Sequence, residues 1–205
     1  MTHPAAKNIL NIYHNHAEAF ARLRSRNLME KSWLDKFIGL IGCSGTVLDI
    51  GCGNGRPMAE YLIQQGYQLT GVDGAAAMLE RARMHFPQQR WLQADMRQLA
   101  LKETFDGLIA WDSFFHLTPD DQRRMLPIFA RHTHPGSVLM FTSGTHNGVA
   151  MGEFEGEPLY HASLAPEEYR QLLADNGFNV IDVVFEDPAC GGHSIWLCQM
   201  AGTGE

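Results

Sequence analysis

Three closely spaced glycines and one aspartate form the pattern in this sequence that points most directly to chemistry. Gly51, Gly53 and Gly55 follow the mostly apolar run 47–50, and Asp73 ends the next apolar run. Glycines let the main chain turn sharply and let a ligand lie against it. A carboxylate at the end of the next strand can accept two hydrogen bonds from a ribose diol. The pattern therefore predicts a site for a ligand that contains a nucleoside.

The elements that must position these residues alternate between short apolar runs and amphipathic segments. Strand–helix–strand repetition favours a parallel sheet covered by helices on both faces. Only residues 186–193 separate the last two predicted strands, so we expect a hairpin there. The predicted fold class is α/β: a Rossmann-like, doubly wound sheet of seven strands, mostly parallel, with one antiparallel strand near the C-terminus. The predicted strands cover residues 47–50, 67–72, 90–93, 105–111, 137–142, 178–185 and 194–200.

Two segments fall outside this repetition. Residues 7–41 place apolar side chains at helical spacing, and the glycines that follow end that pattern. We therefore expect an N-terminal helical cap over residues 1–45 and a ligand-binding domain over residues 46–205. Residues 144–161 are rich in Gly and Glu and show no clear period, which predicts a long loop or lid.

Composition narrows the class of partner. The chain has 205 residues, 45% of them hydrophobic, and a formal net charge of −7, which disfavours a nucleic-acid substrate. No apolar run reaches the roughly 18 residues of a membrane span, and the N-terminal residues do not resemble a signal peptide. We expect a cytoplasmic protein, a monomer or homodimer, that acts neither on nucleic acid nor at a membrane.

The paired histidines at 14/16 and 132/134 do not predict a metal site. Residues two apart on a helix do not share a face, and no cysteine or acidic residue is spaced to complete a ligand set. The four cysteines contain no CxxC pair, so reduced thiols and no metal ion are expected.

Four segments, taken in order, resemble the motifs of class I S-adenosylmethionine-dependent methyltransferases. They are VLDIGCGNG at 47–55, GVD at 71–73, QADM at 93–96 and FDGLIAW at 105–111. The resemblance covers roughly residues 46–142, and the small-molecule branch of the family looks closest. It implies S-adenosylmethionine as cofactor and in-line transfer of its methyl group to an oxygen, nitrogen or other nucleophile of a small molecule.

The resemblance also implies roles for individual residues. Asp73 would hold the ribose hydroxyls, Asp95 and Met96 would meet the adenine, and Trp111 would lie near the sulfonium. The cofactor carboxylate would be reached from the N-terminal region, by Tyr13 or by one of Arg22, Arg24 and Arg26. The full set implied for the cofactor is Asp49, Gly51, Gly53, Asn54, Gly55, Asp73, Gly74, Met78, Asp95, Met96, Trp111 and Tyr13.

On the acceptor side, the segment after 105–111 should lie where the reacting methyl points. His116 is a candidate general base, since the pKa of histidine lies near neutrality, and Asp112 shares that role. The alternative is that these side chains cap or pack. Candidates for the wall of the acceptor pocket are Phe115, His146, Tyr160 and His161.

Other readings of the same residues stay open. A nicotinamide-dependent oxidoreductase would use a glycine turn and a ribose aspartate too, but its fingerprint needs a third glycine at position 56, which is Arg. A non-catalytic module that binds S-adenosylmethionine or S-adenosylhomocysteine would share all the cofactor residues. Methylation of a flipped nucleic-acid base is disfavoured, because residues 111–114 read Trp-Asp-Ser-Phe and no Pro-Cys pair occurs.

Overall fold

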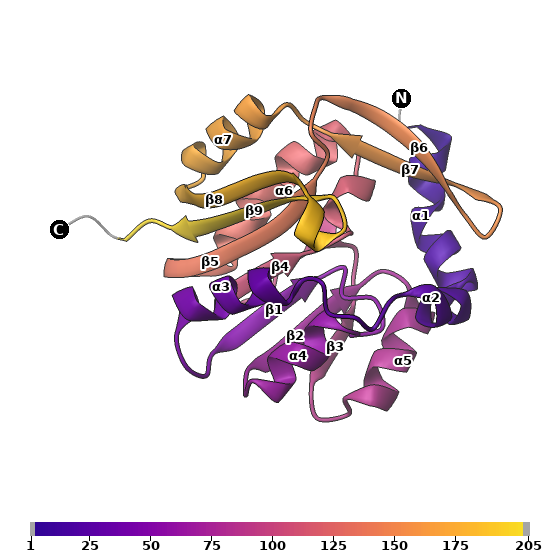
Figure 1. The fold of residues 1–205 in the computed structure, drawn as a ribbon, viewed down its shortest axis with the longest axis horizontal. Coiled ribbons are helices and arrows are strands. Elements are labelled where there is room, and N and C mark those ends of the chain that lie inside the picture. Colours follow the sequence, from indigo (N-terminus) through magenta and orange to yellow (C-terminus); the bar gives the residue numbers. More distant parts are fainter. Residues whose placement is uncertain (1–2, 203–205) are drawn as a thin grey trace.

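A seven-stranded sheet forms the centre of the molecule (Figure 1), described over residues 3–202 by a computed structural model. Its strand order is β3-β2-β1-β4-β5-β9-β8. Only β9 runs antiparallel to its neighbours, β5 and β8, which confirms the predicted sheet. The strands are β1 Thr46–Ile50, β2 Gln68–Asp73, β3 Arg90–Gln93, β4 Phe105–Ala110, β5 Thr133–Ser143, β8 Phe178–Asp187 and β9 His193–Met200.

Helices cover both faces of the sheet because neighbouring residues of each buried strand face opposite sides. Val47 packs with side chains of the first group of helices, and Leu48 packs with those of the second group. The first group is α3 Lys31–Ile41, α4 Met58–Gln64 and α5 Ala76–His85; the second is α6 Pro119–Arg131 and α7 Pro166–Asp175. The parallel strands therefore all end at one edge, where ligands bind in such sheets.

The N-terminal segment divides into parts with different positions. Two helices, α1 Pro4–Asn15 and α2 Ala17–Leu23, lie beyond the carboxyl edge of the sheet, and α1 packs against α5 and β7 Glu157–Ser163 (Figure 1). By contrast, α3 buries Trp33, Leu34 and Phe37 against the sheet. Within the N-terminal segment, α1 and α2 therefore lie over the carboxyl edge of the sheet, while α3 belongs to one of the two helical layers.

The prediction of an irregular loop over residues 144–161 is wrong. Most of this segment is a hairpin of β6 Gly148–Phe154 and β7, closed by Glu155 and Gly156 with φ of +51° and +81°. Positive φ at both central residues is typical of two-residue hairpin turns. The sequence lacked the usual alternation because almost all of β6 is exposed, so no apolar face marks it as a strand.

Candidate active site

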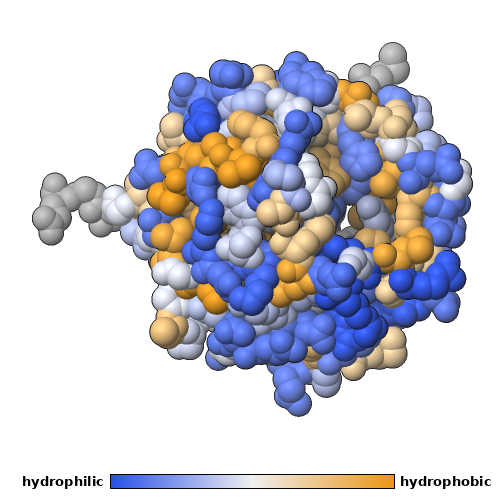
Figure 2. All heavy atoms as spheres, viewed as in Figure 1, coloured by the Kyte–Doolittle hydropathy of each residue, from blue (hydrophilic) through white to orange (hydrophobic). Residues whose placement is uncertain are grey.

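A cavity of about 690 Å³ lies at the carboxyl edge of the sheet, beneath α1 and the β6–β7 hairpin. Figure 2 shows a hollow on this side of the molecule. Eleven of the twelve predicted cofactor residues line the cavity; Asn54 does not. The same cavity is also lined by Asp112, Phe115, His116 and His161, and by residues 191–194, which the sequence had not singled out. The structure thus brings the two predicted groups of residues into one space.

The glycine turn is fixed by the neighbouring strand. Gly51 N–H and Cys52 N–H both donate to the Val72 carbonyl, at 2.7 and 3.1 Å. Gly53 N–H donates to Asp73 Oδ2 at 2.9 Å, and Ala75 N–H donates to Asp73 Oδ1 at 2.8 Å. Burial raises the pKa of Asp73, while these backbone donors oppose the shift. Each carboxylate oxygen has a second acceptor position, so Asp73 can hold the turn and still accept from a ligand.

A second carboxyl group lies close by, at the end of β1. Asp49 is only 6% exposed, and burial together with the charge of Asp73 raises its pKa to about 7. No cation among residues 3–202 contributes to this shift. Two acidic groups without a cation between them favour a ligand that carries positive charge.

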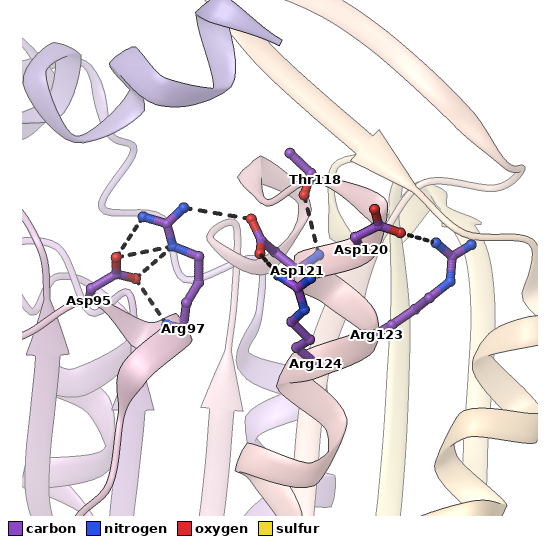
Figure 3. A network of polar contacts seen from close by, with 7 residues as sticks. All are labelled: Asp95, Arg97, Thr118, Asp120, Asp121, Arg123 and Arg124. Carbon is purple, nitrogen blue, oxygen red and sulfur yellow. Dashed lines mark hydrogen bonds and ion pairs between the residues drawn. The ribbon is translucent and has the colours of Figure 1, made fainter. Parts of the chain in front are cut away.

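The Asp95 carboxylate, another predicted cofactor contact, accepts hydrogen bonds from Arg97. Figure 3 shows the forked contact, in which Nε and Nη2 of Arg97 donate to the carboxylate at 2.6–3.0 Å. This arginine lowers the pKa of Asp95 and also lies 3.6 Å from Asp121. The Asp121 carboxylate in turn contacts Arg124 at 3.3 Å. The contact between Asp95 and the adenine stays a prediction. If it forms, the carboxylate would bind both the adenine and Arg97.

His116 is held on both ring nitrogens. Nδ1 lies 2.8 Å from the Tyr160 carbonyl, which can only accept, so the proton is on Nδ1. Nε2 therefore accepts from the Tyr13 hydroxyl at 2.9 Å. Burial lowers the pKa of His116 to about 4 and raises that of Tyr13 above its usual range. The general-base role of His116 stays a prediction. A neutral imidazole that is hydrogen-bonded on both nitrogens and has a low pKa is a weak base.

A second histidine, which the sequence did not reveal, lies closer to Asp112. His193 Nε2 is 3.1 Å from Asp112 Oδ2, and its Nδ1 is 2.7 Å from the Cys190 carbonyl. The hydrogen bond to Asp112 raises the pKa of His193, and its ring stacks on Trp111 with centroids 5.3 Å apart. Asp112 has a φ of +47°, and its Oδ1 also lies 3.0 Å from His193 Nε2. An unusual backbone conformation together with a carboxylate paired to a histidine at the cavity wall indicates a functional position.

Five predicted side chains do not face this cavity. His146 is exposed on the turn before β6, and Asn54 is buried on the outer side of the glycine turn. Tyr160 packs with Ile9 and Ala162 beneath α1, because it alternates along β7 with His161, which does face the cavity. Tyr160 contributes only its carbonyl group. Of the candidate arginines, Arg24 alone lines the cavity, where it pairs with the buried Glu30; Arg22 and Arg26 do not.

Comparison with known proteins agrees with this geometry. A family model described as a methyltransferase domain matches residues 47–136. A ubiquinone biosynthesis O-methyltransferase from Acinetobacter baylyi is 34% identical over 188 residues, which is 82% of this chain and 76% of that protein. A trans-aconitate 2-methyltransferase from Azoarcus sp. is 40% identical over 98 residues, 47% of this chain and 38% of that protein. The chain spans 55–57% of the length of several other methyltransferases that it matches.

A solved structure shares the fold over nearly its whole length. The structure of CalS10 with bound S-adenosylmethionine, an amino pentose methyltransferase from Micromonospora echinaspora, superposes with a TM-score of 0.72. It is 19% identical and covers 91% of this chain and 96% of its own.

The chain belongs to the class I S-adenosylmethionine-dependent methyltransferases. The cofactor of this family is S-adenosylmethionine, and the relatives described above are named as methyltransferases. The nicotinamide-dependent oxidoreductase is therefore wrong, whereas the non-catalytic module shares the family's fold and is tested only by turnover. Among the described residues, no helix combines the length and the apolar character needed to cross a bilayer.

Proposed function

We propose that this enzyme transfers the methyl group of S-adenosylmethionine to a hydroxyl oxygen of a small, flat acceptor such as a phenol or an enol. One observation carries the proposal: a single cavity contains both the glycine turn with Asp73 and the Asp112–His193 ion pair. Two aromatic side chains, Trp111 and Phe115, line the same cavity as Asp112. The O-methyltransferases among its relatives support oxygen as the atom that is methylated.

The residues present fit the cofactor. The buried carboxyls of Asp49 and Asp73, whose pKa values no cation among residues 3–202 lowers, suit a ligand with ammonium and sulfonium groups. The tight glycine turn leaves main-chain atoms open to a nucleoside, and Asp73 retains acceptor positions for its ribose. We propose the cofactor roles of the sequence prediction for the residues that line the cavity.

When bound, S-adenosylmethionine supplies a methyl group activated by the sulfonium. The chain must orient the acceptor, exclude water and take up the hydroxyl proton. Tyr13 and Leu10 of α1 lie over the cavity and exclude water. The Asp112 carboxylate accepts a hydrogen bond from the hydroxyl group of the methyl acceptor, and that proton passes to the carboxylate as the new O–CH3 bond forms. His193 donates to the same carboxylate and fixes its orientation.

Incubating the enzyme with S-adenosylmethionine and a panel of phenols, enols, carboxylic acids and amines tests this function. We expect S-adenosylhomocysteine and an O-methylated product, detected by mass spectrometry, from phenols or enols. Product only from amines or carboxylic acids would refute the acceptor class. An Asp112→Asn variant that turns over the same acceptor at an unchanged rate would refute the proton-accepting role.

The ion pair itself can be tested without any acceptor. We expect His193 to titrate above the ordinary histidine pKa in an NMR titration, and Asp112→Asn to lower its pKa, since hydrogen bonding to Asp112 is the largest cause of the upward shift. The pair should stabilise the fold fully below the unfolded-state pKa of histidine and lose this contribution as pH rises through the folded pKa.

The matched control is Asp106→Asn, which removes a carboxylate beside a different histidine, His134, at 3.1 Å. This change should leave the pKa of His193 as it is. Equal effects of the two substitutions would mean that overall charge, rather than the Asp112 contact, sets the protonation of His193.

A further inference from the structure

A second pocket, of about 340 Å³, lies on the outer side of the glycine turn and is strongly basic. Its walls come from α2 and the residues after it, from the glycine turn and from α5. Five guanidinium groups line it, against the single carboxylate of Glu18. Figure 2 shows strongly hydrophilic side chains in the region where Figure 1 places α2 and α5. Such a concentration is unexpected in a chain with a net charge of −7. The five are Arg22, Arg24, Arg26, Arg56 and Arg81.

The chain's own carboxylates neutralise only part of this charge. Arg24 pairs with the buried Glu30, and Arg56 lies 3.4 Å from Glu60. Arg22, Arg26 and Arg81 form no ion pair with the residues that the structure describes. Arg81 is half-buried, so its charge is less screened than that of a freely exposed side chain. Like charges held this close repel one another, and an anion would relieve that repulsion.

One buried donor is also left without a partner at this pocket. The Nε of Arg56 is buried and has no hydrogen-bond partner among residues 3–202. Asn54 lies at the same pocket, and its Oδ1 accepts from Arg56 N–H at 3.0 Å. Buried donors are normally satisfied, so Arg56 Nε points to a missing acceptor. Guanidinium groups without acceptors are donors that recognise phosphate and carboxylate groups.

We propose that this pocket is an accessory binding site for a small oxyanion with two or more negative charges, a phosphoryl compound or a polycarboxylate. Its concave shape and small volume suit a small molecule. The net negative charge of the whole chain also disfavours a large polyanion such as a nucleic acid. The site is separate from the cofactor cavity, although Arg24, Ser25 and Arg56 line both. The inference goes beyond methyl transfer and does not depend on the identity of the methyl acceptor.

Calorimetric titration of the full chain with pyrophosphate and with citrate, at constant ionic strength, tests the site. We expect saturable binding of one anion per chain and a rise in melting temperature, since a ligand that binds only the folded state stabilises it. Binding of either anion supports the site, and the better ligand identifies its chemistry. No saturable binding of either probe up to about 10 mM, which would correspond to about −2.7 kcal/mol, would overturn the proposal.

Arg81→Gln should weaken anion binding at least tenfold, as should Arg22→Gln. The matched control is Arg131→Gln, which removes the same charge from an exposed position near the end of α6. Equal weakening by the control would mean that the anion responds only to net charge, and the site would be refuted. A cooperative melt of each variant shows that it is folded, and Arg22, exposed on α2, is the variant least able to affect folding.

Repeating the titration with saturating S-adenosylhomocysteine separates this proposal from the proposed function. The anion should still bind. Complete displacement by S-adenosylhomocysteine would mean that the pocket merely receives the carboxylate of the cofactor, which would overturn the accessory site. A failure of S-adenosylhomocysteine to bind, with anion binding intact, would count against the cofactor roles and leave the anion site supported.

Discussion

Replacing Asp73 with alanine should weaken the binding of S-adenosylhomocysteine on the order of 100-fold, or about 2.7 kcal/mol. Hydrogen bonds to a charged group contribute roughly 1.5–3 kcal/mol each, and two ribose hydroxyls can donate to this carboxylate. The same substitution also removes the acceptors of Gly53 N–H and Ala75 N–H, which hold the glycine turn. Isothermal titration calorimetry of the variant and the native chain measures the effect.

Asp73→Asn separates these two contributions. Asparagine keeps one oxygen and so can retain one of the two backbone contacts, but it loses the charge. We expect it to be as stable as or more stable than the alanine variant and still to bind S-adenosylhomocysteine more weakly than the native chain. A dissociation constant unchanged in both variants would remove the ribose role from Asp73. Weak binding together with a lost thermal transition would instead indicate collapse of the turn.

The glycine turn and Asp73 could be predicted because their signal is local. A buried parallel strand is a short apolar run, and the residues that follow it must lie at the carboxyl edge of the sheet, whatever the rest of the chain does. The same logic placed β3 at residues 90–93 and β4 from residue 105. Even the antiparallel β9 followed from a connection too short to contain a helix.

The acceptor side could not be predicted in this way, because it depends on contacts between distant segments. Asp112 and His193 are 81 positions apart, and no spacing in the sequence joins them. Burial beneath α1 and β7 lowers the pKa of His116, while its hydrogen bond to the Tyr160 carbonyl opposes the shift, and the sequence alone does not reveal this environment. Tyr160 and His161 were both candidates, and only the register of the hairpin decides which of them faces the cavity.

Gly51→Ala should cost about 2–5 kcal/mol in the free energy of unfolding, the largest stability effect that we expect from a single methyl group. Gly51 has a φ of +79°, where an L-residue loses roughly 1–2 kcal/mol. The added Cβ would lie 2.2 Å from Ser113 Cβ and 2.6 Å from its Oγ. Overpacking of this kind typically costs about 1–3 kcal/mol more. Urea unfolding measures the total.

The matched control is Gly66→Ala, because Gly66 has a φ of +91° and nothing within 4 Å of an added Cβ. It should show only the backbone cost. The double variant Gly51→Ala/Ser113→Gly removes the obstructing side chain and should recover part of the loss, which a double-mutant cycle measures. Equal unfolding energies for Gly51→Ala and Gly66→Ala would show that the segment after β4, which carries Ser113, yields to the methyl group. In that case, the close approach of Ser113 would not be the reason that position 51, in the wall of the cofactor cavity, is a glycine.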